Sequence, residues 1–167
     1  SEMCIRDRIH IVATIGSAYA KIYKNGQLDT TVADSSALPA TGTRSYYLIG
    51  KSIAADAGYS GRLFNGTVAY VRIWHGTVLD ATQVSTLYDN RPSIVPSTPT
   101  HDWDFRNQSG QSTITDSIDG SSLMSFYNNN SSATLPNDTG ATLTGTEYLV
   151  TNQAEIFVAP YTIELFV

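Results

Sequence analysis

The sequence has few of the residues that build disulfides, zinc sites or nucleophilic active sites. Its 167 residues include one cysteine, Cys4, which excludes an internal disulfide framework. Three histidines, His10, His75 and His101, are dispersed, and no two have the H-x-x-x-H spacing of a zinc site. No G-x-S-x-G elbow is present either. These absences argue against a zinc site and against a cysteine or serine nucleophile.

Charge and long apolar runs are also scarce. Only 15% of the residues are charged, and the net charge is −5. Because no basic cluster exists, we expect no nucleic-acid partner. No apolar run is long enough to span a bilayer, so we expect no membrane insertion.

What is abundant is Ser, Thr, Asn, Gly and Tyr, a composition that favours an all-β protein with many turns. The first eight residues, SEMCIRDR, differ from the rest because they are charged and show no strand alternation. They resemble the translated read-through of a sequencing adapter. We interpret residues 1–8 as an artefactual or disordered head. No signal peptide is visible, as expected if the start is truncated.

Alternating apolar residues and turn signals predict the strands. Tyr19, Lys21 and Tyr23 share one face of the segment AYAKIY, and Asn25-Gly26 is a strong hairpin signal. In the second part of the chain, YNNNSS (127–132) is expected to be a loop, and NQAEIFVAP (152–160) a connector. Strands are expected at 9–15, 18–23, 28–32, 45–52, 63–79, 101–105, 141–151 (as a strand pair or a bulged strand) and 161–167.

One helix is expected, over residues 79–90. Asp80 can cap its first turn, and Gln83 completes a capping box three residues later. Val84, Leu87 and Tyr88 form its apolar stripe. The segment that follows, RPSIVPSTPT, contains three prolines and reads as a linker.

Two groups of motifs carry a family resemblance. Residues 61–90 and the hairpin 9–28 resemble the closing part of a laminin G-like (concanavalin A-like) domain. The stretches DWDF, TDSIDGSS, LTGTEYLV and YTIELFV, within 101–167, resemble its opening part. The resemblance implies an all-β, antiparallel jelly-roll β-sandwich with one short helix, incomplete and circularly permuted.

This order defines the predicted domain organisation. Residues 9–92 are the closing half of one domain, 93–100 a Pro-rich linker, and 101–167 the opening half of the next. The chain is then a fragment of a tandem array. If the two halves pack as one sandwich, residues 103–105 lie near residues 66–74 in a shared core.

The resemblance also implies a calcium site at Asp116 and Asp119, because calcium prefers oxygen ligands. The sequence departs from the family where a companion acidic pair is replaced by Ala69 and Tyr70. The alternative is that both aspartates form Asx-turns, with Gly120 permitting the tight turn.

Paired carboxylates were considered for catalysis. Asp102 and Asp104 share a strand face and so resemble a glycosidase pair. The favoured alternative is a solvated outer face whose alternation buries Trp103 and Phe105. The glutamates outside the head form no Glu-x-Asp-x-x-Glu cluster; they are Glu147, Glu155 and Glu164. We therefore expect no catalytic residues and no enzyme activity.

Aromatic side chains are the expected binding groups, since sugars lie flat on aromatic rings while amides bond their hydroxyls. The alternative for each is a place in the core or at its rim. The candidates are Tyr46, Tyr47, Tyr59, Trp74, Tyr127 and Asn128.

These observations predict a non-catalytic recognition module of a secreted or surface multidomain protein. Its partners would be glycans or extracellular proteins, and its location extracellular, cell-surface or virion-associated. The alternatives are a structural spacer repeat of a phage tail or adhesin, and an ancillary module of a glycoside hydrolase.

Overall fold

The structure is a computed structural model of the whole chain. It describes residues 8–33, 42–44, 48–51, 64–91, 97–129, 131–151, 155–157 and 160–167, with only the backbone described at 42–44 and 155–157. The chain divides into two compact units. Unit 1 comprises Ser1–Gly42, Val71–Thr100 and Val158–Val167, and unit 2 comprises Thr43–Tyr70 and His101–Phe157.

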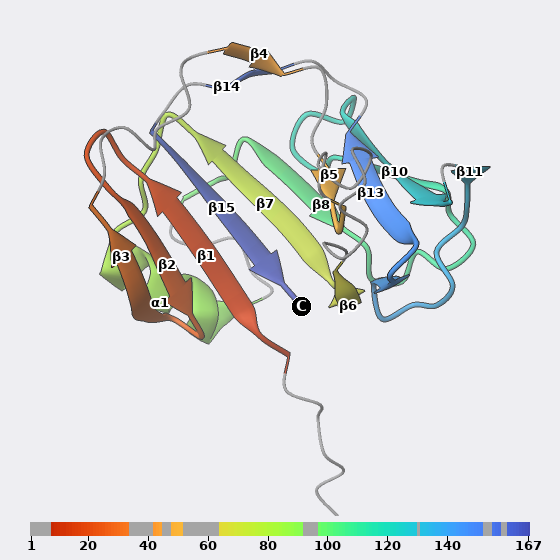
Figure 1. Cartoon of the computed structure of the whole chain (residues 1–167), viewed down its shortest axis with the longest axis horizontal. Helices are drawn as coiled ribbons and strands as arrows, with labels where there is room; N and C mark the ends of the chain where they lie inside the picture. Colours follow the sequence, from red (N-terminus) through yellow and green to blue (C-terminus); the bar gives the residue numbers. More distant parts are fainter. Residues whose placement is uncertain are drawn as a thin grey trace, which may run out of the picture. The chain divides into compact units, whose positions relative to one another are not determined.

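Unit 1 contains an antiparallel hairpin built by the predicted turn. Strands β1 (His10–Ile15), β2 (Ala20–Lys24) and β3 (Gln27–Val32) lie side by side, as Figure 1 shows. Asn25 and Gly26 connect β2 to β3 with φ of 50° and 78°. Both positions need positive φ, which Asn and Gly tolerate better than other residues. The predicted hairpin is confirmed.

Strands from both ends of the chain are neighbours in this sheet. The order continues from β1 to β15 (Tyr161–Phe166) and then to β7 (Tyr70–His75) (Figure 1). β1 and β15 are antiparallel, with Val12 opposite Glu164 and Ile15 opposite Tyr161. YTIELFV is therefore a paired strand rather than a free end.

Helix α1 (Ala81–Asn90) belongs to unit 1 and begins where its sequence predicts. The Asp80 carboxylate accepts a hydrogen bond from the Gln83 N–H, and the Gln83 side chain accepts one from the Asp80 N–H. This capping box confirms the expected helix start. The apolar stripe of α1 closes the core of unit 1, which contains Val12, Tyr23, Trp74, Leu79, Val84 and Leu87.

Unit 2 is also made of antiparallel strands. Its main sheet has the order β11 (Ser131–Ser132), β10 (Leu123–Asn128), β13 (Glu147–Thr151), β5 (Leu48–Ile49), with β9 (Thr113–Thr115) also on β10. Two short pairs accompany it, β6 (Asn65–Val68) with β12 (Ala141–Thr144), and β4 (Gly42–Arg44) with β14 (Glu155–Phe157). Strand β8 (His101–Asp104) contributes buried side chains.

Segments from both sequence halves therefore meet inside each unit. In unit 1, β1 pairs with β15; in unit 2, β6 pairs with β12, and the Phe105 N–H donates to the Ala69 carbonyl over 2.9 Å. The bond between Phe105 and Ala69 joins two of the segments that were expected to lie close together. A single permuted sandwich remains a proposal, and the all-β class with one helix is confirmed.

Three expectations were wrong in detail. The segment 63–79 contains two strands that part at Ala69, because β6 pairs with β12 whereas β7 runs beside β15. Part of the expected loop YNNNSS is strand: β10 reaches Asn128, which pairs with Ser131 of β11. The connector at 152–160 contains β14.

None of the described helices is long and apolar enough to cross a membrane.

Candidate functional site

A small cleft opens in unit 1 between the β1–β2 hairpin and the chain entering α1. Its volume is about 200 Å³. We name it the tyrosine cleft. It is lined by Thr14, Tyr19, Lys21, Tyr23, Val78, Leu79, Asp80 and Ala81.

Strand β2 and Tyr19, the residue just before it, place the cleft's aromatic and basic groups together. Tyr19, Lys21 and Tyr23 share one face, and the Lys21 ammonium lies 4.6 Å from the centre of the Tyr19 ring. Tyr19 is half-buried, whereas Tyr23 is only 2% exposed and anchors the cleft in the core. The cleft therefore has one accessible ring and one fixed ring.

The cleft also holds an unused hydrogen-bonding group. Thr14 is fully buried on β1, and its Oγ1 has no hydrogen-bond partner among the described residues. An unsatisfied buried hydroxyl costs free energy, so a polar ligand that reaches it is stabilised. Asp80 also lines the cleft, and its carboxylate accepts from the Gln83 N–H through Oδ1. Hydroxyl, ammonium, carboxylate and ring faces around an apolar floor suit a polyhydroxylated ligand.

A second group of polar residues lies in unit 2. His101, Asp116 and Asp119 each offer one ligand atom, and these atoms lie within 4.8 Å of one another. The His101 Nδ1 is 2.5 Å from Asp116 Oδ2 and 3.7 Å from Asp119 Oδ2. His101 stacks on Trp103, with ring centres 5.1 Å apart. In the described part of the chain, this is the one His/Cys/Asp/Glu cluster that could hold a metal ion.

Hydrogen bonds already use most of the carboxylate capacity of this cluster. Asp116 is buried, and its Oδ1 accepts from the N–H groups of Asp102 (3.0 Å) and Ile118 (2.8 Å). Asp119 Oδ1 accepts from the N–H groups of Ser121 (2.7 Å) and Ser122 (2.8 Å). The Ser122 hydroxyl donates to Asp119 Oδ2. These are the bonds of Asx-turns, the alternative that the sequence suggested.

The electrostatics of Asp119 follow from those bonds. Burial raises the pKa of Asp119, but the hydrogen bonds from Ser122 and Ser121 and the nearby His101 lower it, to about 2. The carboxylate is thus held ionised by donors from its own loop. The hydrogen bonds of the loop therefore account for the ionised Asp119 without a bound metal ion.

The cluster does not fit calcium as arranged. Calcium takes six to eight oxygen ligands, whereas one of the three ligand atoms here is an imidazole nitrogen. The two Oδ1 atoms each accept two N–H bonds and have no lone pair left for an ion. A set of one histidine and two aspartates is chemically closer to the sites of transition metals, which accept imidazole nitrogen as a ligand.

The predicted binding residues Tyr127 and Asn128 lie on strand β10 in unit 2. Tyr127 stacks on Tyr148 across the strand pair, with ring centres 5.5 Å apart, and the Lys51 ammonium lies 4.7 Å from the centre of the Tyr148 ring. Asn128 bonds Glu147 through its amide (3.0 Å). Adjacent residues of a strand point to opposite faces, so Tyr127 and Asn128 do not contact one ligand from the same face.

Trp74 belongs to the core rather than to a binding surface. It is 2% exposed, and its indole N–H donates to the Ser97 carbonyl over 3.1 Å. A sugar could stack on this ring only if the core opened, so the expectation for Trp74 is corrected to a structural role. The remaining aromatic candidates, Tyr46, Tyr47 and Tyr59, lie outside the described residues.

The carboxylates considered for catalysis are structural in different ways. Asp102 is 5% exposed and accepts from the Ser117 hydroxyl over 3.0 Å, so the expectation that it faces solvent was wrong. Asp104 pairs with Arg106 and raises the pKa of that guanidinium, mainly through their hydrogen bond. Trp103 and Phe105 are buried as predicted.

Sequence reasoning did not select the tyrosine cleft. The shared face of Tyr19, Lys21 and Tyr23 was visible from strand alternation. Thr14 lies opposite Lys21 in the pairing of β1 with β2. The sequence contained no sign that Asp80 approaches the same face, because that contact depends on how the chain entering α1 folds back onto the sheet.

Comparison with known proteins supports the family. The model of the concanavalin A-like lectin/glucanases superfamily matches residues 9–85. This segment therefore belongs to a laminin G-like domain of the concanavalin A-like type, as its motifs predicted. No curated protein and no solved structure matches the chain.

Proposed function

We propose that the protein is a non-catalytic carbohydrate-binding module. The observation that carries the proposal is the tyrosine cleft, where a half-buried tyrosine, a lysine and an unsatisfied buried threonine hydroxyl converge. The superfamily of residues 9–85 includes lectins, which supports carbohydrate over other polar ligands. A cleft of about 200 Å³ suits a single sugar unit of a longer glycan rather than a buried oligosaccharide.

In this proposal each lining group has a separate role. Tyr19 provides the ring on which the C–H face of the sugar lies. Thr14 and Lys21 bond sugar hydroxyls, and Asp80 accepts from another hydroxyl through the carboxylate oxygen not used for capping. Asp80 is the one carboxylate among the described residues that line the cleft.

A glycan array of the intact chain tests the proposal. Tyr19→Ala and Thr14→Val should each abolish or strongly weaken the binding of any glycan that the chain captures. Tyr127→Ala is the matched control, because this tyrosine lies in unit 2. A folded chain that captures no glycan would favour a structural spacer. Glycan binding that is lost in Tyr127→Ala but kept in Tyr19→Ala would instead place the binding site on strand β10.

The same proposal places the module outside the cell, where laminin G-like domains typically occur. Its partners would be surface or matrix glycans. We further propose that hydrogen bonds, rather than calcium, hold the loop of Asp116 and Asp119. Their Oδ1 atoms already accept two N–H bonds each.

A further inference from the structure

A larger cavity lies in unit 1 at the other end of α1, where the helix meets the ends of three strands. Its volume is about 630 Å³, within the range of small-molecule sites. We name it the basic cavity. It is lined by Arg8, Ile9, Lys24, Asn25, Tyr88, Arg91 and Phe166.

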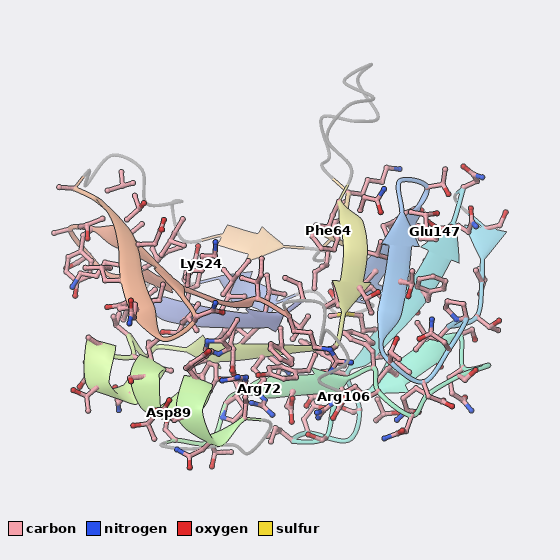
Figure 2. All side chains as sticks on the ribbon, turned by 90° about the horizontal axis from the view of Figure 1, so that it is seen from below. Lys24, Phe64, Arg72, Asp89, Arg106 and Glu147 are labelled. Carbon is pink, nitrogen blue, oxygen red and sulfur yellow. The ribbon has the colours of Figure 1, made fainter. Side chains whose placement is uncertain are left out.

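The cavity concentrates positive charge in a chain whose net charge is −5. Three of its lining residues are cationic, and none of the described lining residues is acidic. Asp89, the acidic neighbour on α1, is exposed on the side of the helix that faces away from the sheet (Figure 2). A local excess of cations raises the concentration of anionic ligands at such a surface.

The only acidic side chain of the lining strand β15 is already neutralised. Glu164 precedes Phe166 by two positions on β15 and is fully buried. Its oxygens lie 2.7 Å from the ring of His10 and 3.3 Å from the guanidinium of Arg72. The charge of Glu164 is therefore balanced inside the sheet and does not compensate the cations of the cavity.

Arg91 is held in a fixed orientation at the wall of the cavity. Its guanidinium carbon lies 3.8 Å from the centre of the Tyr88 ring and 5.5 Å from the centre of the Phe166 ring. One of its nitrogens donates to the Tyr88 carbonyl at the end of α1. Arginine has five N–H donors in a planar fork, and this bond uses one of them. A guanidinium stacked on a ring in this way is prepared to bind a carboxylate through two parallel bonds.

Lys24 and Asn25 also line the cavity. Lys24 is an exposed residue at the end of β2 (labelled in Figure 2), and the Asn25 carbonyl oxygen of the side chain accepts from the His10 N–H over 3.0 Å. That bond fixes the Asn25 amide, whose NH₂ group is then a donor of defined position. Arg8 belongs to the segment interpreted as a head, so the argument rests on Lys24, Asn25 and Arg91.

From this arrangement we infer that the basic cavity binds the carboxylate of a uronic acid unit in an acidic polysaccharide. Arg91 holds the carboxylate, Lys24 adds charge, and Asn25 donates to a neighbouring sugar oxygen. The inference extends the proposed glycan-binding function to charged sugars, and it uses a cavity separate from the tyrosine cleft. Neutral sugars lack the group that this cavity is built to bind.

Titration calorimetry of the full chain with a galacturonate tetrasaccharide tests this inference, with the neutral galactose tetrasaccharide as comparison. We expect the charged ligand to bind, and its affinity to fall as the salt concentration is raised from about 20 to about 300 mM, because salt screens the attraction between exposed charges. Lys24→Gln should weaken it roughly fivefold, and Arg91→Gln roughly tenfold or more. Lys51→Gln removes the same charge from unit 2 and is the matched control, expected to leave binding unchanged.

Because Arg91 also bonds the end of α1, its replacement can lower stability. Lys24→Gln alters an exposed side chain and keeps the test valid if Arg91→Gln does not fold. The inference is overturned if the galacturonate ligand does not bind, or binds equally to Lys24→Gln and the unchanged protein. Binding of neutral glycans that depends on Tyr19 would then leave the proposed function intact. If Lys51→Gln lowers the affinity for the galacturonate ligand as much as Lys24→Gln does, the attraction is non-specific and the inference is also overturned.

Discussion

His10 and Glu164, 154 positions apart in the sequence, are in contact inside one sheet. The His10 Nε2 and the Glu164 Oε1 lie 2.7 Å apart, and both side chains are fully buried. Arg72 on β7 reaches the other oxygen of Glu164 over 3.3 Å. Glu164 comes from the second part of the chain, and its partners come from the first. The charged contact therefore links β1, β15 and β7.

Replacing Glu164 should destabilise the whole of unit 1. In Glu164→Gln, the buried Arg72 loses the negative charge of one of its partners. Loss of one partner of a buried ion pair typically costs about 3 kcal/mol or more. Urea unfolding followed by tryptophan fluorescence would measure the change, since Trp74 lies in the core of this unit.

A second variant separates the charge effect from packing. Glu164→Leu combined with Arg72→Met removes both charges, so it should be more stable than Glu164→Gln. If Glu164→Gln unfolds at the same urea concentration as the unchanged protein, this contact is not a structural link between the two sequence parts.

Local signals in the sequence predicted much of unit 1. The Asn25-Gly26 turn and the Asp80–Gln83 capping box each lie within a few residues, and both form as expected. The contact between His10 and Glu164 could not be predicted in this way. Nothing local to either residue indicates a partner, because the register of β1 against β15 sets their distance.

The candidate sites show the same division. Strand alternation predicted that Tyr19, Lys21 and Tyr23 share a face, but it did not predict that Thr14 would be buried without a partner. Trp74 looked like a binding residue because aromatic residues suit both cores and sugars. Trp74 lies in the core rather than at a binding surface because α1 covers that face of the sheet.

Stability should fall in acid because of Asp119. Its pKa is lowered to about 2 in the folded state, below the value of 3.8 that applies to an exposed aspartate. A lowered pKa means that the stabilisation is complete above about pH 4 and is lost as pH falls toward 2. The contribution should be only roughly 1 kcal/mol, since solvent screens this partly exposed carboxylate.

Comparing unfolding at pH 7 and pH 2.5 would reveal this contribution. Asp119→Asn should lower stability at pH 7 and show a smaller loss on acidification than the unchanged protein. Asp29→Asn alters an exposed carboxylate of β3 and should keep the full acid dependence. An Asp119→Asn variant with an undiminished acid dependence would contradict the role of the loop bonds.

Calcium should have little effect on the folded chain. The Oδ1 atoms of Asp116 and Asp119 each accept two N–H bonds, so an ion would have to displace loop hydrogen bonds. We expect the same melting temperature in 5 mM calcium and in 5 mM EDTA, concentrations chosen to be about saturating for a millimolar extracellular site. A calcium-dependent rise that disappears in Asp119→Asn would show that the loop rearranges to bind the ion.

Asp80 combines a structural and a proposed binding role, and two substitutions can separate them. Asparagine caps helices about as well as aspartate, so Asp80→Asn should keep the stability of the protein within a few tenths of a kcal/mol. Asp80→Ala removes the bond to the Gln83 N–H and should cost about 1 kcal/mol. Both remove the carboxylate from the tyrosine cleft and should weaken glycan binding. If Asp80→Asn binds glycans as well as the unchanged protein, Asp80 acts only as a helix cap, and the cleft binds its ligand through Thr14, Tyr19 and Lys21.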